Sequence, residues 1–104
     1  MDKYALLVRL QAKKGKEAEV DKFLRDALPA VSDEPDTSVW FALKLDQSTF
    51  FIFDTFPDEN ARQAHLSGKI AKALAERSSE LFSKTPEIEK LDITAVKMPE
   101  VIQY

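Results

Sequence analysis

Two adjacent apolar runs constrain the fold of this chain more than any other feature. Residues 39–43 are Val-Trp-Phe-Ala-Leu, and residues 49–53 are Thr-Phe-Phe-Ile-Phe. Both runs are apolar on both alternating sets of positions, which is typical of strands that are buried on both faces. The short link 46–48 between the strand segments 38–45 and 49–56 predicts an antiparallel hairpin. We therefore expect a sheet that needs a cover on each side.

The segments around this hairpin predict helices. Six apolar residues after Gly15 recur at helical spacing and form one face: Val20, Phe23, Leu24, Ala27, Leu28 and Val31. Pro29 lacks a backbone N–H, so we expect that helix to end or bend near it. Asp58 is a suitable cap for a second helical region, which Gly68 interrupts and Pro86 ends.

The remaining segments complete a four-stranded domain. Residues 4–12 and 87–98 predict two further strands. The resulting order, βαββαβ, is that of a ferredoxin-like α+β fold, a four-stranded antiparallel sheet with the helices on one face. The chain has 104 residues, which suffices for a single domain, residues 1–104, and not for two. The other sheet face would expose an apolar patch that soluble monomers rarely tolerate, so we expect a homodimer in which a second copy covers it.

The composition limits the partners and the setting. A net charge of −3 and a pI near 5.2 argue against binding to nucleic acid or to an anionic membrane. The one dense basic cluster, residues 13–16, falls between a strand and a helix, which favours a solvated turn over a phosphate site. The chain has no cysteine, no segment like a secretory signal and no apolar stretch that could span a bilayer. We therefore expect a reducing, cytoplasmic setting.

The sequence lacks the residues that several kinds of binding site and active site require. Gly15 and Gly68 are the only glycines, so no glycine-rich loop can hold a dinucleotide phosphate. His65 is the only histidine, so two histidines and a carboxylate cannot bind a metal within one chain. No Gly-x-Ser-x-Gly elbow can form. If the protein is a redox enzyme, we expect it to work without a tightly bound cofactor or metal.

His65 is the most interesting polar residue for function. It shares a helix face with Ala61 and Ala64, whose small side chains leave room for a cavity beside the imidazole. With an ordinary pKa near 6.5, it could act as a base or as a hydrogen-bond donor near neutral pH. The alternative is a core histidine that bonds a backbone carbonyl, and the residues alone favour this alternative.

Four other side chains are candidates for a binding site. Trp40 could line a pocket for a planar aromatic ligand, although a core or interface tryptophan is more common. Arg9 interrupts an apolar strand, and it could stabilise a bound anion or pair with a carboxylate such as Asp54. Phe53 could contact a ligand, whereas its neighbouring phenylalanines are expected in the core and the interface.

One segment carries a wider resemblance. Residues 53–66 are Phe-Asp-Thr-Phe-Pro-Asp-Glu-Asn-Ala-Arg-Gln-Ala-His-Leu, in which an acidic and an aromatic residue end the strand and an Asp-Glu helix start leads to the histidine. The characteristic positions are Asp54, Phe56, Asp58, Glu59, Ala61, Ala64 and His65. With a Gly-Lys-Glu helix start and a Glu-Pro-Asp turn before the second strand, the chain resembles the antibiotic biosynthesis monooxygenase family from about residue 4 to residue 98.

The resemblance implies a dimeric α+β barrel and a range of activities. Some members of that family oxygenate polycyclic aromatic or quinol substrates with molecular oxygen and no cofactor, and others cleave haem. Haem-degrading relatives carry a ligand histidine around the position of Ala75 and an asparagine in the first strand, and this chain has neither. Haem cleavage is therefore disfavoured. Asp36 replaces the usual glycine of the turn before the second strand, which affects local geometry more than chemistry.

The resemblance, together with the single histidine on an apolar helix face, implies a cofactor-independent monooxygenase that acts on a phenolic or quinol-like aromatic small molecule. In this hypothesis His65 and Arg9 are catalytic and favour the substrate anion, while Trp40, Phe53 and Asp54 bind the substrate in a dry pocket. The alternative is a non-catalytic dimer, a small-molecule-binding or stress-associated protein that uses the same cavity. A third possibility is a barrel filled by its own phenylalanines, with no pocket.

Overall fold

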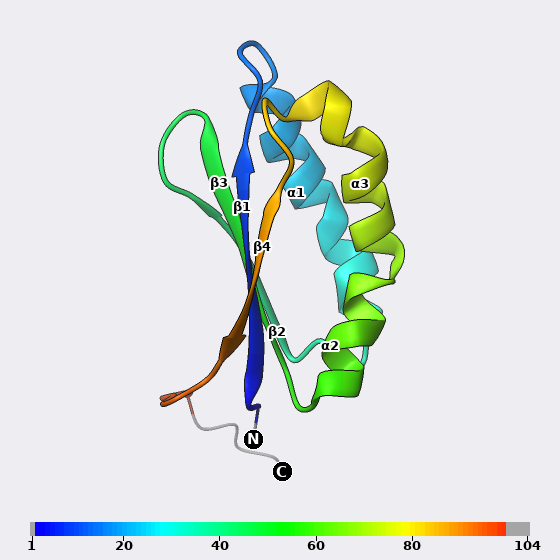
Figure 1. Cartoon of the computed structure of the whole chain (residues 1–104), viewed down its shortest axis with the longest axis vertical. Helices are drawn as coiled ribbons and strands as arrows, with labels where there is room; N and C mark the ends of the chain where they lie inside the picture. The colour runs from blue at the N-terminus through cyan, green and yellow to red at the C-terminus, as the bar shows by residue number, and fades with distance from the viewer. Residues whose placement is uncertain (1, 100–104) are drawn as a thin grey trace.

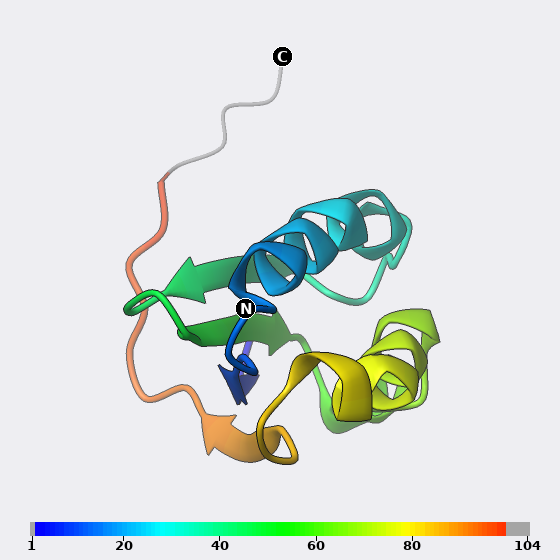
Figure 2. The same cartoon turned by 90° about the horizontal axis from the view of Figure 1, so that it is seen from above.

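The structure, a computed structural model, describes residues 2–99 and has one antiparallel sheet with helices on one side. In chain order the elements are β1 (Tyr4–Gln11), α1 (Glu17–Ser32), β2 (Val39–Lys44), β3 (Thr49–Phe56), α2 (Glu59–Leu66), α3 (Lys69–Leu81) and β4 (Glu87–Asp92). The strands are ordered β2-β3-β1-β4, and all neighbours are antiparallel. Figures 1 and 2 show all three helices on the same face. This arrangement confirms the predicted ferredoxin-like α+β fold.

The face of the sheet that the helices cover contains the main core. Alternating residues of β1 and β3 point toward the helices, with Val8 opposite Ile52 and Leu10 opposite Phe50. The same buried cluster includes residues of both long helices: Val20 and Leu24 of α1, and Leu74 and Leu81 of α3. The apolar spacing found in the sequence therefore identifies most of the surfaces that the helices bury.

Short side chains determine where two of the connections turn. The Asp46 carboxylate accepts hydrogen bonds from the backbone N–H groups of Ser48 and Thr49, at 3.0 and 2.9 Å. These bonds close the β2–β3 hairpin without glycine, because an aspartate side chain can take the place of a backbone acceptor in a turn. The Asp58 carboxylate accepts the N–H of Ala61 at 2.8 Å and caps α2, as the sequence predicted.

Helix α1 ends at Ser32, three residues after Pro29 and so near the end that the sequence predicted. Two other expectations about the elements are wrong in detail. Leu28 was placed on the buried face of that helix, but its side chain is 53% exposed. Strand β4 ends at Asp92 instead of residue 98. Asp92 pairs with Tyr4, the first residue of β1, so strand β1 offers no partner for the residues after Asp92.

Among residues 2–99, no helix covers the second face of the sheet, which we call the open face. Its apolar residues lie side by side in register, with Phe53 between Phe41 of β2 and Leu7 of β1. The Phe41 side chain is 53% exposed, and Leu43 on the same strand is 47% exposed. The segment that follows β4 leaves the sheet on the side of the open face (Figure 2). The sheet is thus apolar on both faces, as the sequence predicted, and within residues 2–99 the helices cover only one of them.

Candidate functional site

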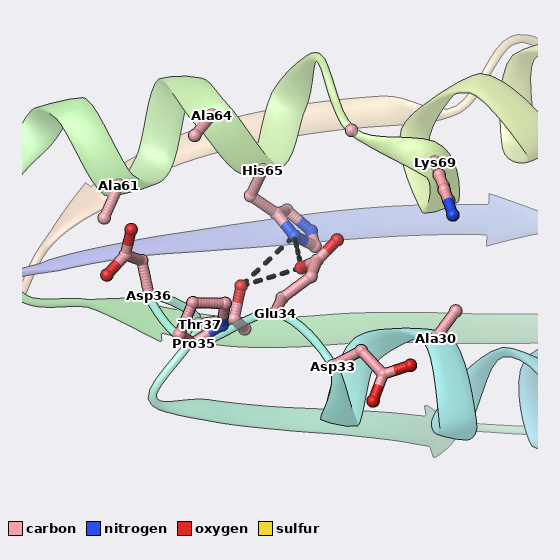
Figure 3. Close-up of a pocket in the computed structure, with 11 residues that line it drawn as sticks. Ala30, Asp33, Glu34, Pro35, Asp36, Thr37, Ala61, Ala64, His65 and Lys69 are labelled. Carbon is pink, nitrogen blue, oxygen red and sulfur yellow. Dashed lines mark hydrogen bonds and ion pairs between the residues drawn. The ribbon is translucent and has the colours of Figure 1, made fainter.

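The single histidine lies between two carboxylates from different parts of the chain. His65, near the end of α2, places its Nε2 atom 2.8 Å from Oδ2 of Asp54 on β3. Its Nδ1 atom lies 2.7 Å from Oε2 of Glu34, in the connection between α1 and β2. The Thr37 hydroxyl donates to the same Glu34 oxygen at 2.9 Å and lies 3.4 Å from Nδ1 (Figure 3). The cluster joins one helix, one strand and one loop.

The surroundings of His65 favour its protonated form. Burial alone would lower the pKa of the imidazole, but hydrogen bonding and charge from Asp54, and then from Glu34, outweigh it and raise the pKa above 6.5. The position in the last turn of α2 acts in the same direction, since the negative end of a helix stabilises a cation. The two carboxylates therefore favour the imidazolium form of His65 over the neutral ring.

Asp54 is the most deeply buried member of the cluster. Its residue is 0% exposed, and neither carboxylate oxygen has a partner of hydrogen-bond geometry among residues 2–99, although Oδ2 lies 2.8 Å from Nε2 of His65. A buried carboxylate without an opposite charge is costly, so the contact with His65 offsets the burial of both groups. The Phe56 ring packs near the imidazole, with its centroid 5.3 Å from that of His65.

A pocket of about 360 Å³ opens beside His65. Its lining comes from the end of α1, the α1–β2 connection, α2 and the start of α3: Ala30, Asp33, Glu34, Pro35, Asp36, Thr37, Ala61, Ala64, His65, Gly68 and Lys69. The small side chains of Ala61 and Ala64 lie on the same helix as the imidazole (Figure 3). Pockets of 300 to 1,000 Å³ are the usual size for small-molecule sites. The cavity expected from the His65–alanine spacing is therefore present.

The candidate residues of the sequence divide between the two faces of the sheet. Asp54 and Trp40 are paired across β3 and β2, and both point toward the helices. Trp40 packs against the core, its Nε1 atom has no partner among the described residues, and it does not line the His65 pocket. Arg9 and Phe53 lie on the open face, where the Arg9 guanidinium is 5.4 Å from the centre of the Phe51 ring. Within one subunit, the structure does not bring these two residues to His65.

Two alternatives left open by the sequence are decided by these contacts. Asp54 is paired with His65, so the suggested pairing of Arg9 with Asp54 is wrong, because the two side chains point to opposite faces. A histidine satisfied by a backbone carbonyl is also wrong, because both ring nitrogens face carboxylates. The helix-face pattern alone could not distinguish these partners.

The sequence analysis missed Glu34 and Thr37 as site residues. They lie in a connection rich in acidic residues that was identified only as a turn. The antiparallel order of β2 and β3 places this connection at the same end of the sheet as the start of α2. The three carboxylates within residues 33–36, together with this position next to the start of α2, could have identified Glu34 and Thr37 as site residues.

Residues 2–99 contain neither a cluster of side chains that could hold a metal ion nor a helix that could cross a membrane. Across residues 2–99, no group of three or more His, Cys, Asp or Glu side chains could hold a metal ion. Asp54 and Glu34 bind different nitrogens of one ring, so they do not converge on a common point. Over the same residues, none of the helices combines the length and the apolar character needed to cross a membrane.

Solved structures provide the comparison with known proteins. A protein of unknown function from Nitrosomonas europaea, NE2512, is 50% identical over 97% of this chain and 98% of its own, with a TM-score of 0.93. A provisionally named antibiotic biosynthesis monooxygenase from Caulobacter crescentus is 20% identical, covers 90% of this chain and 92% of its own, and has a TM-score of 0.77. A second protein with such a provisional name, from Nitrosomonas europaea, is 13% identical over 88% and 99%, with a TM-score of 0.79.

The other two comparisons gave no match: no family model and no curated protein matches the sequence. At 20% identity or less, the named monooxygenases establish a common fold and leave the activity of this chain open. The resemblance expected from residues 53–66 is thus confirmed at the level of the fold. The chain belongs to the family of the NE2512 protein, and it has the fold of the solved structures named antibiotic biosynthesis monooxygenases.

Proposed function

We propose that the protein is a cofactor-independent monooxygenase that acts on a phenolic or quinol-like aromatic small molecule. The observation that carries this proposal is the His65 cluster at the edge of a pocket, with Asp54 behind the imidazole and Glu34 in front of it. A phenol that enters the pocket meets a carboxylate that can accept its proton and an imidazolium that can stabilise the resulting anion.

The proposed reaction divides these roles among three residues. Glu34 accepts the hydroxyl proton and in doing so gives up its contact with Nδ1 of His65, so that the Nδ1–H group can hold the phenolate oxygen. Asp54, at Nε2, keeps the imidazole charged and oriented. The phenolate transfers an electron to molecular oxygen, and the radical and superoxide combine into a peroxide. This peroxide loses water to give a quinone. One oxygen atom stays on the ring, the other leaves as water, and the substrate loses two hydrogens, so that atoms and electrons balance.

The proposal changes the roles given to four residues in the sequence analysis. Asp54 acts through His65 instead of touching the substrate, because His65 lies between it and the pocket. Trp40 lies opposite Asp54 on the neighbouring strand and packs against the core instead of contacting the substrate. Arg9 and Phe53 belong to the open face, where we propose that a second copy of the chain packs.

A homodimer is supported by the open face itself. Phe41, Leu43 and Phe53 lie on adjacent positions of two strands, and two of these side chains are about half exposed. Contiguous apolar patches of this kind mark interaction sites, and a two-fold pairing covers identical patches with one another. Sedimentation equilibrium from micromolar to millimolar concentration tests this part: we expect twice the subunit mass, and a single-subunit mass throughout would contradict it.

Oxygen uptake tests the enzymatic part. Purified protein should consume oxygen with at least one member of a panel of anthrones and hydroquinones, with one quinone formed for each oxygen molecule. His65→Ala should lower kcat by about 10²- to 10⁴-fold, the usual contribution of one acid–base group. Gln63→Ala, an exposed position on the same helix, is the matched control and should leave kcat unchanged.

Two outcomes would overturn the enzymatic part. Turnover that survives His65→Ala removes the histidine from the mechanism, provided that circular dichroism shows the variant folded. Saturable binding of the same aromatics without oxygen uptake or quinone formation assigns the pocket to a binding protein of the same fold.

A further inference from the structure

Two polar atoms on neighbouring strands are buried close to the His65 cluster without a hydrogen-bond partner. The Nε1 atom of Trp40 is inaccessible to solvent and is unpaired among residues 2–99, and the same holds for the Oδ1 atom of Asp54. Buried polar groups are nearly always bonded to protein or to ordered water, because an unpaired group gives up its hydration without compensation. Each of these atoms therefore calls for a partner other than the described side chains.

The two atoms have complementary chemistry and belong to residues that lie directly opposite each other. Trp40 of β2 pairs with Asp54 of β3, and both side chains lie on the helix-covered face. Directly opposite residues on antiparallel strands have Cβ atoms about 4.5 to 5.5 Å apart. An indole N–H can only donate a hydrogen bond, and an ionised carboxylate can only accept one. An unpaired donor and an unpaired acceptor are thus close neighbours in the core.

One water molecule can satisfy both atoms. The two groups do not bond each other directly, whereas a buried water accepts from an N–H and donates to a carboxylate at the same time. We infer that Trp40 is a positioning residue for the His65 site: its indole N–H donates to a single buried water, which in turn donates to Oδ1 of Asp54. This role follows from burial and strand pairing, and it does not depend on the proposed reaction.

The bridge gives the Asp54 carboxylate a second point of attachment. Its Oδ2 atom lies 2.8 Å from Nε2 of His65, but the terminal torsion of an aspartate is broad, so a single contact leaves the carboxylate free to turn. A donor at Oδ1 fixes the plane of the carboxylate and, through it, the orientation of the imidazole. Trp40 does not line the His65 pocket, so it acts on the site only through Asp54.

NMR spectroscopy of the whole chain tests the bridge. The sequence contains one tryptophan and one histidine, so the ring signals of Trp40 and His65 are each unique. The indole N–H should show a rotating-frame Overhauser cross peak with water, of the sign that distinguishes a bound water from proton exchange. Asp54→Asn should move the indole N–H signal upfield, because a neutral amide is a weaker acceptor than a carboxylate.

Asp21→Asn is the matched control for that shift. Asp21, Arg25 and Lys44 are the charged residues of a groove between α1 and β2 that Trp40 also lines, and Asp21 is paired with Arg25. The indole signal should stay in place in this variant. A shift as large as that in Asp54→Asn would assign the indole N–H to the groove and overturn the inference.

A second variant tests the bridge from the side of the histidine. Trp40→Phe keeps an aromatic ring and removes the donor. Loss of a donor raises the proton affinity of a carboxylate, and Asp54 is coupled to His65, so the titration midpoint of the His65 ring signals should rise. If Trp40 only packs against the core, the midpoint should stay constant or fall toward the ordinary value of about 6.5 as the packing loosens.

Three results would overturn the inference. They are a missing water cross peak, an indole signal that does not move in Asp54→Asn, and an unchanged or lowered His65 midpoint in Trp40→Phe that circular dichroism shows to be folded. None of these measurements uses a substrate, so the bridge can be confirmed even if the protein consumes no oxygen, and oxygen uptake can be confirmed without the bridge.

Discussion

The two faces of the sheet are built from alternating residues of the same strands, yet they are completed in different ways. Phe50 and Ile52 of β3 face the helices and belong to a closed core, whereas Phe51 and Phe53 face the open side. The helix-covered face also contains a charged cluster, in which the two carboxylates beside His65 come from the sheet and from a loop. The comparison teaches that an apolar pattern shows which surfaces must be buried, while the partner that buries them depends on topology or on a second chain.

The largest expected effect comes from truncating matched aromatics on the two faces. Phe50 is 2% exposed, and Phe50→Ala should lower the free energy of unfolding by about 3 to 5 kcal/mol. Phe41→Ala, on the open face, should cost less than about 1 kcal/mol in a single subunit, because its side chain is already half exposed. Urea denaturation at low and high protein concentration measures both.

The concentration dependence makes this pair informative. If a second copy covers the open face, the cost of Phe41→Ala should grow with protein concentration, while that of Phe50→Ala should stay constant. Equal costs for the two variants at low concentration would contradict the difference between the faces.

The second effect concerns the charged cluster beneath α2. His65→Ala leaves the Asp54 carboxylate buried without an opposite charge, and we expect it to lower the free energy of unfolding by about 3 kcal/mol at pH 6. Adding Asp54→Asn to that variant removes the isolated charge and should recover part of the loss. A double-mutant cycle by urea denaturation gives the coupling, and strictly additive costs would show that the two side chains are independent.

The strands, helices and histidine pocket could be predicted from the sequence because each depends on local spacing. The helical spacing of Val20, Leu24 and Val31 identified the buried face of α1, and the two alanines before His65 indicated a cavity. Glu34 could not be predicted as a partner of His65, because the two residues are 31 positions apart and meet only when β2 and β3 pair. The opposite orientation of Arg9 and Asp54 likewise depends on the register between β1 and β3, which alternation within one strand does not fix.

A third effect concerns the open face alone. Leu43→Lys places a charge in the patch that we propose to be the dimer interface, and it should weaken association by at least about tenfold. Lys72→Glu, an exposed charge change on α3, is the control and should leave association unchanged. Analytical ultracentrifugation of both variants measures the effect, and an unchanged dimer in Leu43→Lys would place the interface elsewhere.

The smallest effect is a pH dependence that belongs to the helix-covered face only. Burial alone would lower the pKa of His65, but Asp54 and Glu34 raise it above the value of about 6.5 expected in the unfolded chain, so the folded protein binds this proton more tightly. The resulting stabilisation is fully present below pH 6.5 and is lost as the pH rises through the folded pKa. Urea denaturation between pH 5.5 and 9 should show this decline, His65→Gln should abolish it, and Glu34→Gln should reduce it while Asp54 still holds the ring. A decline of equal size in His65→Gln would assign the pH dependence to other groups, and the charged cluster would then contribute nothing to the difference between the two faces.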